Sequence, residues 1–216
     1  MQDEWVNMDL FVLPIAEAAQ LPEGYCTSHF PDRLARSRQM HALDRLRCIA
    51  AGALIAHAMG VCEKDLIRGE YGKIDARGDL HFNLSHSGDY AILARHTFDV
   101  GADIECIRNP RERLAPRVLL PDEIEWMQRD PQSRFYTLWT IKESVLKLTG
   151  KGLAMPMQSF SAMPILMGQG MPLGDRMVYG ASMRIGDCAA AICAWNPFEA
   201  PEPVMLTASA ILQAQH

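Results

Sequence analysis

The chain has 216 residues and 49% of them are hydrophobic, which is enough to bury the core of one large domain or of two small ones. Its formal net charge of −5 argues against a nucleic-acid-binding protein, because such proteins carry an excess of basic residues. No apolar run approaches the roughly 20 residues that a membrane-spanning helix requires. We therefore expect neither nucleic acid nor a membrane as a partner.

Two features predict a cytoplasmic protein. The first four residues are acidic rather than basic, unlike the start of a signal peptide. The cysteines are scattered and form no Cys-x-x-Cys pair, so we expect buried free thiols in a reducing compartment rather than a zinc site. These cysteines are Cys26, Cys48, Cys62, Cys106, Cys188 and Cys193.

The first part of the chain predicts a strand followed by a long basic helix. Apolar and polar residues alternate over about residues 5–15, as in a half-buried strand. Apolar residues then recur at helical spacing over about residues 31–59, and Gly60 is a suitable end for this helix. Its polar side carries Arg33, Arg36, Arg38, Arg45 and Arg47. Such a run is typical of a solvated face, but guanidinium groups also bind phosphates in bidentate fashion, and both roles stay open.

Residues 72–94 predict two turns that could meet a phosphate. Gly72 permits a tight turn that would present Lys73 at its end. Residues 80–94 then predict two strands joined by a turn at Gly88. Three polar side chains stand just before this glycine: Ser85, His86 and Ser87. They could bind an anion; a nucleophilic serine–histidine pair would need an orienting acid, and none accompanies them.

The stretch at residues 100–105 predicts a short strand with two acids on one face. Side chains two positions apart in a strand point the same way, so Asp103 and Glu105 lie together. Two neighbouring carboxylates repel each other unless a cation lies between them, and such oxygen ligands suit Mg²⁺. A solvated strand face would give the same pattern, so this stretch alone does not decide between the two.

Two helices are predicted after this strand. Pro121 opens a short acidic helix, in which Glu123 also suits the positive end of the helix dipole. Residues 131–148 form a second helix, in which Glu143 and Lys147 lie one turn apart on the same face. They are either an ordinary helix ion pair, or a third carboxylate for a metal and a lysine for a phosphate or for proton transfer.

A weak internal repeat predicts two similar halves. Residues 178–183 and 187–195 predict a hairpin about Gly186, and residues 182–189 resemble residues 84–91. We therefore expect two α+β halves, at residues 1–98 and 99–197. Residues 198–216 form a tail with little signal, and its prolines predict a flexible start.

The ordered motifs resemble one known family. They are Tyr71-Gly72-Lys73, Phe82-Asn83-Leu84-Ser85-His86-Ser87, Gly101-Ala102-Asp103-Ile104-Glu105, Trp139-Thr140-Ile141-Lys142-Glu143-Ser144 with Lys147, and Gly150-Lys151-Gly152-Leu153. In this order they resemble the 4′-phosphopantetheinyl transferases of the larger, pseudo-dimeric type. That type activates nonribosomal peptide, polyketide and fatty-acid synthases.

The resemblance implies a fold and a reaction. The fold is α+β, with two similar halves related by a pseudo-two-fold and the active site in the cleft between them. The enzyme would bind coenzyme A with Mg²⁺, or Mn²⁺, on its pyrophosphate. A serine hydroxyl of an apo acyl or peptidyl carrier protein would attack the β-phosphate, take the 4′-phosphopantetheine arm and release adenosine 3′,5′-bisphosphate. Two halves in one chain would make a monomer sufficient.

The resemblance also implies roles for individual residues. The metal-site acids would be Asp103, Glu105 and Glu143, with Glu123 close to the metal. The catalytic residues would be Glu143, as the base for the serine proton, and Lys147. The coenzyme A phosphates would contact Lys73, Ser85, His86 and Lys147, and Arg47 would hold the 3′-phosphate, with Arg45 as the alternative.

Two departures and two alternatives accompany this interpretation. Ile74 stands where the family often has proline, and Ala102 where it has a larger aliphatic residue. A noncatalytic module that binds coenzyme A or a carrier protein would need no carboxylates, so the three acids argue against it. Another Mg²⁺-dependent phosphoryl or nucleotidyl transferase could use the same acids, but the serine–histidine turn and the Trp-x-x-Lys-Glu helix disfavour it.

Overall fold

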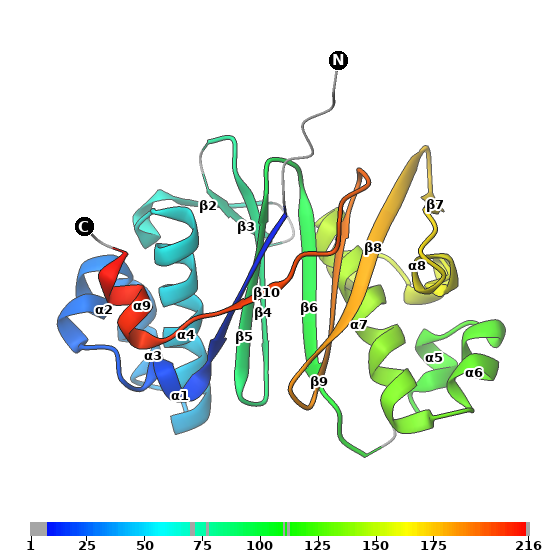
Figure 1. Ribbon diagram of the computed structural model, residues 1–216, viewed down its shortest axis with the longest axis horizontal. Helices are drawn as coiled ribbons and strands as arrows, with labels where there is room; N and C mark the ends of the chain where they lie inside the picture. The colour runs from blue at the N-terminus through cyan, green and yellow to red at the C-terminus, as the bar shows by residue number, and fades with distance from the viewer. Residues whose placement is uncertain (1–7, 70–71, 77, 110, 112, 215–216) are drawn as a thin grey trace.

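The computed structural model describes residues 8–69, 72–76, 78–109, 111 and 113–214, and shows a mixed α+β protein (Figure 1). The first part contains β1 (Asp9–Pro14), α1 (Ile15–Ala18), α2 (Glu23–His29), α3 (Pro31–Ser37), α4 (Ala42–Met59), β2 (Leu66–Arg68), β3 (Ile74–Ala76), β4 (His81–Ser87) and β5 (Tyr90–His96). The second contains β6 (Val100–Cys106), α5 (Ala115–Val118), α6 (Pro121–Met127), α7 (Pro131–Thr149), α8 (Met163–Leu166), β7 (Met171–Leu173), β8 (Arg176–Ile185), β9 (Cys188–Ala194), β10 (Pro203–Met205) and α9 (Ala208–Gln213). Residues 5–7 of the predicted first strand, and Tyr71 of the predicted turn, lie outside the described residues.

The two large sheets repeat one strand order. One runs β10-β1-β5-β4 and the other β6-β9-β8-β7. In each, the strand that precedes the long helix pairs antiparallel with the second strand of the later hairpin. Both hairpins turn at a glycine with positive φ, +53° at Gly88 and +57° at Gly186, where residues with a side chain are strained. The two sheets therefore share one arrangement, in which the strand before a long helix lies beside the later hairpin.

Three apolar cores hold the molecule together. One lies between α4 and the first sheet, and a second between α7 and the other sheet. The third lies between the two sheets, where alternate residues of β6, Val100, Ala102 and Ile104, pack with residues of β1 and β5. The opposite face of β6 is left for α7, so the side chains at 101, 103 and 105 point toward that helix.

The long helix predicted at residues 31–59 is two helices, and this prediction was wrong. Helix α3 ends at Ser37 and α4 begins at Ala42. The buried Ser37 hydroxyl donates to the carbonyl of Leu34 at 2.7 Å, and the N–H groups of Gln39 and Met40 bond three residues back instead of four. Serine side chains that bond their own backbone compete with helix continuation in this way. The predicted end at Gly60 is confirmed: it caps α4 in the left-handed conformation.

The last residues return to the first half of the molecule. Strand β10 pairs in parallel with β1, and α9 follows it (orange and red in Figure 1). Leu206 and Ile211 are buried in the core of the first half. The N–H of Ala208 donates to Glu17 at 2.8 Å. Residues 198–214 are therefore a strap between the halves rather than a free tail, and Pro203 opens a strand instead of a flexible segment.

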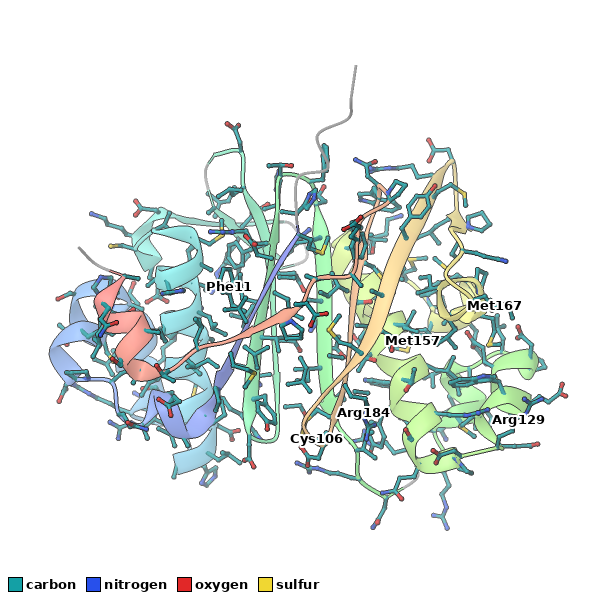
Figure 2. The ribbon with its side chains drawn as sticks, in the orientation of Figure 1. Phe11, Cys106, Arg129, Met157, Met167 and Arg184 are labelled. Carbon is teal, nitrogen blue, oxygen red and sulfur yellow. A yellow bond between two sulfur atoms is a disulfide. The ribbon has the colours of Figure 1, made fainter. Side chains whose placement is uncertain are left out.

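One cysteine pair differs from the expectation of free thiols. Cys106 and Cys188 stand opposite each other in β6 and β9 and are joined by a disulfide, at the lower end of β6 in Figure 2. Cys26, Cys48, Cys62 and Cys193 are free. Within the described residues, no helix is long and apolar enough to cross a bilayer.

Candidate active site

Gly101 lets helix α7 lie directly on strand β6. A Cβ atom at this position would stand 1.9 Å from the carbonyl oxygen of Ser144 and 2.5 Å from the amide nitrogen of Leu148. Any other residue would push the helix away, because real Cβ atoms do not approach so closely. The contact brings the turn of α7 that carries Glu143 and Lys147 against the face of β6 that carries the acids.

Asp103 is the buried centre of the site. Its side chain is 7% exposed, and its Oδ1 accepts hydrogen bonds from Ser85 at 2.8 Å and from the Lys147 ammonium at 2.7 Å. Its Oδ2 is buried and has no hydrogen-bond partner among the described residues. Buried carboxylate oxygens are costly unless a donor or a cation satisfies them. The second oxygen is therefore available to a metal ion.

Glu105 and Glu143 complete the group of acids. Glu105 is half-buried, and its Oε2 accepts a hydrogen bond from Ser87 at 2.8 Å. Burial raises the pKa of Glu143 to about 7, the charges of Asp103 and Glu105 add to this effect, and Lys147 opposes it. Glu143 is thus close enough to Asp103 and Glu105 for both charges to act on it.

The chemistry of this group fits an open magnesium site. Within the described part of the chain, two other groups of three metal-ligand side chains converge within 4.8 Å, and the acids of this site do not form such a closed cage. Magnesium ordinarily keeps several waters and binds through one or two carboxylates and substrate phosphates. The unpartnered oxygen of Asp103, beside two further carboxylates, suits that mode of binding.

A cavity with lysines opens beside these acids. It has a volume of about 280 Å³, and Lys73 and Lys147 both line it. The Lys73 ammonium pairs with Asp99 at 3.0 Å, so it is held at the cavity by a half-exposed carboxylate. Asn83, Gly150 and Gly152 also line this space. Ile74, the departure from proline noted above, is a cavity-lining residue at the start of β3.

Arg47 and Arg45 face different parts of the molecule. The Arg47 guanidinium donates to the carbonyl of Gly88, at 3.1 and 3.3 Å, and so reaches the β4–β5 turn. Arg45 instead lines a separate cavity formed by the helices of the first half. Partial desolvation, the Arg47 charge and the Lys147 charge lower the pKa of His86. The structure therefore groups Arg47, and not Arg45, with the predicted site.

Comparisons with known proteins show which family the chain belongs to. A model of the 4′-phosphopantetheinyl transferase superfamily matches residues 99–171. The 4′-phosphopantetheinyl transferase HetI of Nostoc sp. is 30% identical over 168 residues, covering 68% of this chain and 70% of that protein. The chain belongs to the 4′-phosphopantetheinyl transferase superfamily.

Other relatives match a shorter part of the chain. The 4′-phosphopantetheinyl transferase gsp of Aneurinibacillus migulanus is 40% identical over 97 residues, which are 43% of this chain and 41% of that protein. A 4′-phosphopantetheinyl transferase of Bacillus subtilis is 42% identical over 98 residues, 43% of this chain and 44% of that protein. The matched segment thus spans less than half of the length of these relatives.

Glu123, which the resemblance places near a metal, is bound by other groups of the protein. It is fully buried, and the N–H groups of Leu120 and Ala162 donate to it at 2.7 and 2.6 Å. The Lys142 ammonium is 3.0 Å from its Oε2 and is also fully buried. These contacts cap the start of α6 at Leu120 and join α6 to Lys142 of α7 and to Ala162, so we leave Glu123 out of the proposed metal site.

Two residues of β4 contact β6 in ways that sequence reasoning missed. Asn83, Ser85 and Ser87 lie on one face of the strand, and we call them the β4 polar row. Asn83 accepts a hydrogen bond from the N–H of Ala102 at 2.9 Å, and Ser87 from that of Cys106 at 3.1 Å. The polar alternation of β4 is visible in the sequence, but the partner strand is not.

The two closed clusters elsewhere are already occupied by their own contacts. Asp75 and His81 are hydrogen-bonded at 2.9 Å, and their neighbour Asp99 pairs with Lys73. In the other cluster Cys106 and Cys188 are bonded to each other, beside Asp187. Neither offers the unpartnered buried oxygen that distinguishes Asp103.

Proposed function

We propose that this protein transfers the 4′-phosphopantetheine arm of coenzyme A to a serine of an apo acyl or peptidyl carrier protein, with Mg²⁺ and with release of adenosine 3′,5′-bisphosphate. The observation that carries the proposal is the buried Asp103, which has one oxygen on Lys147 and the other without a partner, beside Glu105 and Glu143. Membership of the superfamily supports the same reaction.

Asp103, Glu105 and Glu143 would hold the metal ion. When bound, Mg²⁺ supplies positive charge that neutralises the pyrophosphate oxygens and stabilises the leaving group. Mn²⁺ could replace it, because carboxylate sites accept both ions. The residues of the chain then have to orient coenzyme A and accept the proton of the carrier serine.

Glu143 is the candidate base for the proton of the carrier serine. A general base works best with a pKa near the operating pH, and the pKa of Glu143 is raised to about 7. No hydrogen bond to its carboxylate is present among the described residues, so it is free to accept one. Lys147, held between Ser85 and Asp103, presents its charge where phosphate oxygens would lie.

The remaining cations would hold coenzyme A. Lys73 lines the cavity next to Lys147, and we assign it to the phosphates together with Ser85 and His86. Arg47 is assigned to the 3′-phosphate, because it reaches the turn that follows His86. Two-point guanidinium contacts to phosphate are strong and directional.

We propose residues 1–98 and 99–197 as the two halves, with the cleft between them as the site. The acids lie on β6 and α7 of the second half, while Lys73, Ser85 and Arg47 come from the first. We further propose a cytoplasmic monomer that serves the carrier proteins of nonribosomal peptide, polyketide or fatty-acid synthesis.

Intact-mass measurement of an apo carrier protein tests the reaction. The carrier should gain the mass of one phosphopantetheine arm in the presence of coenzyme A and Mg²⁺, and should gain nothing when the metal is chelated. Asp103→Asn should abolish the gain while the protein remains folded. Coenzyme A binding without any transfer, across several acyl and peptidyl carriers, would favour a noncatalytic binding module.

A further inference from the structure

The β4 polar row serves two functions at once. Strand β6 is the edge of its sheet, so no strand of the described residues pairs with its outward N–H groups. Asn83 and Ser87 accept hydrogen bonds from two of them, at Ala102 and Cys106. Ser85 and Ser87 also donate to the carboxylates of β6. A strand of the first half thus closes the edge of β6 and contacts its acids.

The direction of each serine hydroxyl follows from its other partner. The N–H of Cys106 can only donate, so the Ser87 oxygen accepts that bond and its own proton is left for Glu105, 2.8 Å away. Ser85 accepts in the same way from the Lys147 ammonium at 2.9 Å and donates to Asp103. Each serine is therefore a fixed donor to one acid.

The two acids depend on these donors to different degrees. Asp103 is also bound by Lys147. Glu105 has only one hydrogen-bond partner among the described residues, and that partner is Ser87. Removing Ser87 would leave the Glu105 carboxylate free to rotate, whereas Asp103 would keep its ammonium contact.

We propose that Ser87 is a positioning residue that orients Glu105 for the metal ion. The proposal rests on the metal site of the proposed function. Groups that hydrogen-bond to metal-binding side chains fix the orientation of those side chains, and losing one such group typically weakens metal affinity about 10–100-fold. Ser87 belongs to the first half and Glu105 to the second, so the metal site depends on how the two halves are docked.

Binding of Mn²⁺ tests this role without turnover. The dissociation constant is measured from the electron paramagnetic resonance signal of free Mn²⁺, with and without coenzyme A and without a carrier protein. Ser87→Ala should raise this constant about tenfold or more, and Ser87→Thr, which keeps a hydroxyl, should restore it. Ser182→Ala removes an exposed serine of β8 and should leave the constant unchanged.

A double-mutant cycle separates orientation from a general effect on the fold. Ser87→Ala also removes the acceptor of the Cys106 N–H, and that loss is the same whether or not residue 105 is an acid. In a Glu105→Gln background, Ser87→Ala should therefore cause little further loss of Mn²⁺ affinity. The kcat for transfer at saturating metal should fall less than the metal affinity does.

The outcomes are distinct from those of the transfer assay. Equal Mn²⁺ affinity of Ser87→Ala and the unchanged protein would overturn the role of Ser87 and leave the transferase proposal intact. The same loss in the Glu105→Gln background would show a general effect and would also overturn it. If the unchanged protein bound no Mn²⁺ under either condition, the metal site and this inference would fail together, while the mass assay would report on transfer separately.

Discussion

The three acids of the site are restrained to different degrees. Asp103 is buried and shares an oxygen with Lys147, so its position is fixed. Glu105 has one donor, Ser87. Glu143 accepts no hydrogen bond among the described residues and its pKa is raised. This lack of restraint agrees with the role proposed for Glu143, as the base for the carrier serine.

The raised pKa of Glu143 predicts a pH-dependent stability in metal-free protein. Its pKa is about 7 in the folded state against 4.5 for an unperturbed glutamate, so the folded state binds more protons between these values. Stability should therefore fall as pH rises through this window, by at most about 3 kcal/mol. Thermal unfolding measured from pH 4.5 to pH 8 checks this, and Glu143→Gln should remove most of the slope. A slope unchanged by that substitution would assign the effect to other groups.

Arg47 and Arg45 provide a matched pair for the 3′-phosphate. Arg47→Ala should weaken coenzyme A binding about 10–100-fold, because a charged hydrogen-bond partner is lost, and should affect 3′-dephospho-coenzyme A much less. Arg45→Ala should leave both ligands unchanged, because Arg45 lines a different cavity. Isothermal titration with the two ligands decides the matter, and equal losses for both would remove Arg47 from this role.

At the scale of single residues, the sequence predicted the positions of Asp103 and Glu105 but not the residues that hydrogen-bond to the acids. Alternation along β6 placed Asp103 and Glu105 on one face, and that is where they lie. The partners of Glu123 could not be predicted, because the Lys142 ammonium reaches it only after α6 and α7 have packed. Ser87 was visible as a polar residue in a turn, but its target belongs to the other half.

At the scale of elements, the separation of α7 from β6 is set by Gly101. Gly101→Ala should destabilise the protein by about 1–3 kcal/mol, because the new methyl group would clash with backbone atoms of α7, which cannot rotate away as a side chain could. The rate of transfer should also fall, even under conditions in which the variant is fully folded, because Glu143 and Lys147 move with the helix. Chemical denaturation and the mass assay measure the two effects. Gly24→Ala, where a Cβ would meet nothing within 4 Å beyond its chain neighbours and its own helix, is the control and should not destabilise the protein.

The buried pair of Glu123 and Lys142 joins three elements. Lys142 also donates to the carbonyls of Met157 and Phe160, at 2.9 and 2.8 Å. Lys142→Met should cost about 3–5 kcal/mol, because it leaves a buried carboxylate without its counter-charge. Adding Glu123→Gln should recover much of that loss. Urea denaturation of the three variants measures it, and a double variant no more stable than Lys142→Met alone would contradict the account.

Helix periodicity predicted which residues are helical better than where helices stop. The pattern at residues 131–148 matches α7, whose end at Gly150 is left-handed. The pattern at residues 31–59 continued through the break after Ser37, because apolar residues on both sides of the break face the same core. Periodicity reports the buried face and does not report the backbone that links two such faces.

At the scale of the whole molecule, the two halves are joined by more than their shared cleft. Strand β10 and helix α9 carry Leu206 and Ile211 into the core of the first half. The sequence predicted a tail with little structure, because prolines near residue 200 disfavour a strand and the strand that forms there has only three residues. Parallel pairing of β10 with β1 joins distant parts of the chain and has no local signal.

Ile211 tests the contribution of the strap. Ile211→Ala should lower the free energy of unfolding by about 2–5 kcal/mol, because the side chain is 1% exposed and its removal leaves a cavity. Val204→Ala, at a residue of β10 that is 47% exposed, should cost much less. Equilibrium unfolding in urea compares them, and equal small losses would show that α9 is only loosely attached.

The strap also determines when the protein can finish folding during its synthesis. Domains generally fold in the order in which they leave the ribosome. Here the first half to be made lacks the outer strand of its sheet and part of its core until residues 203–211 have emerged. The earliest part of the chain is therefore completed only after the second half has been made, and a nascent chain should bind coenzyme A only after residues 203–211 have emerged.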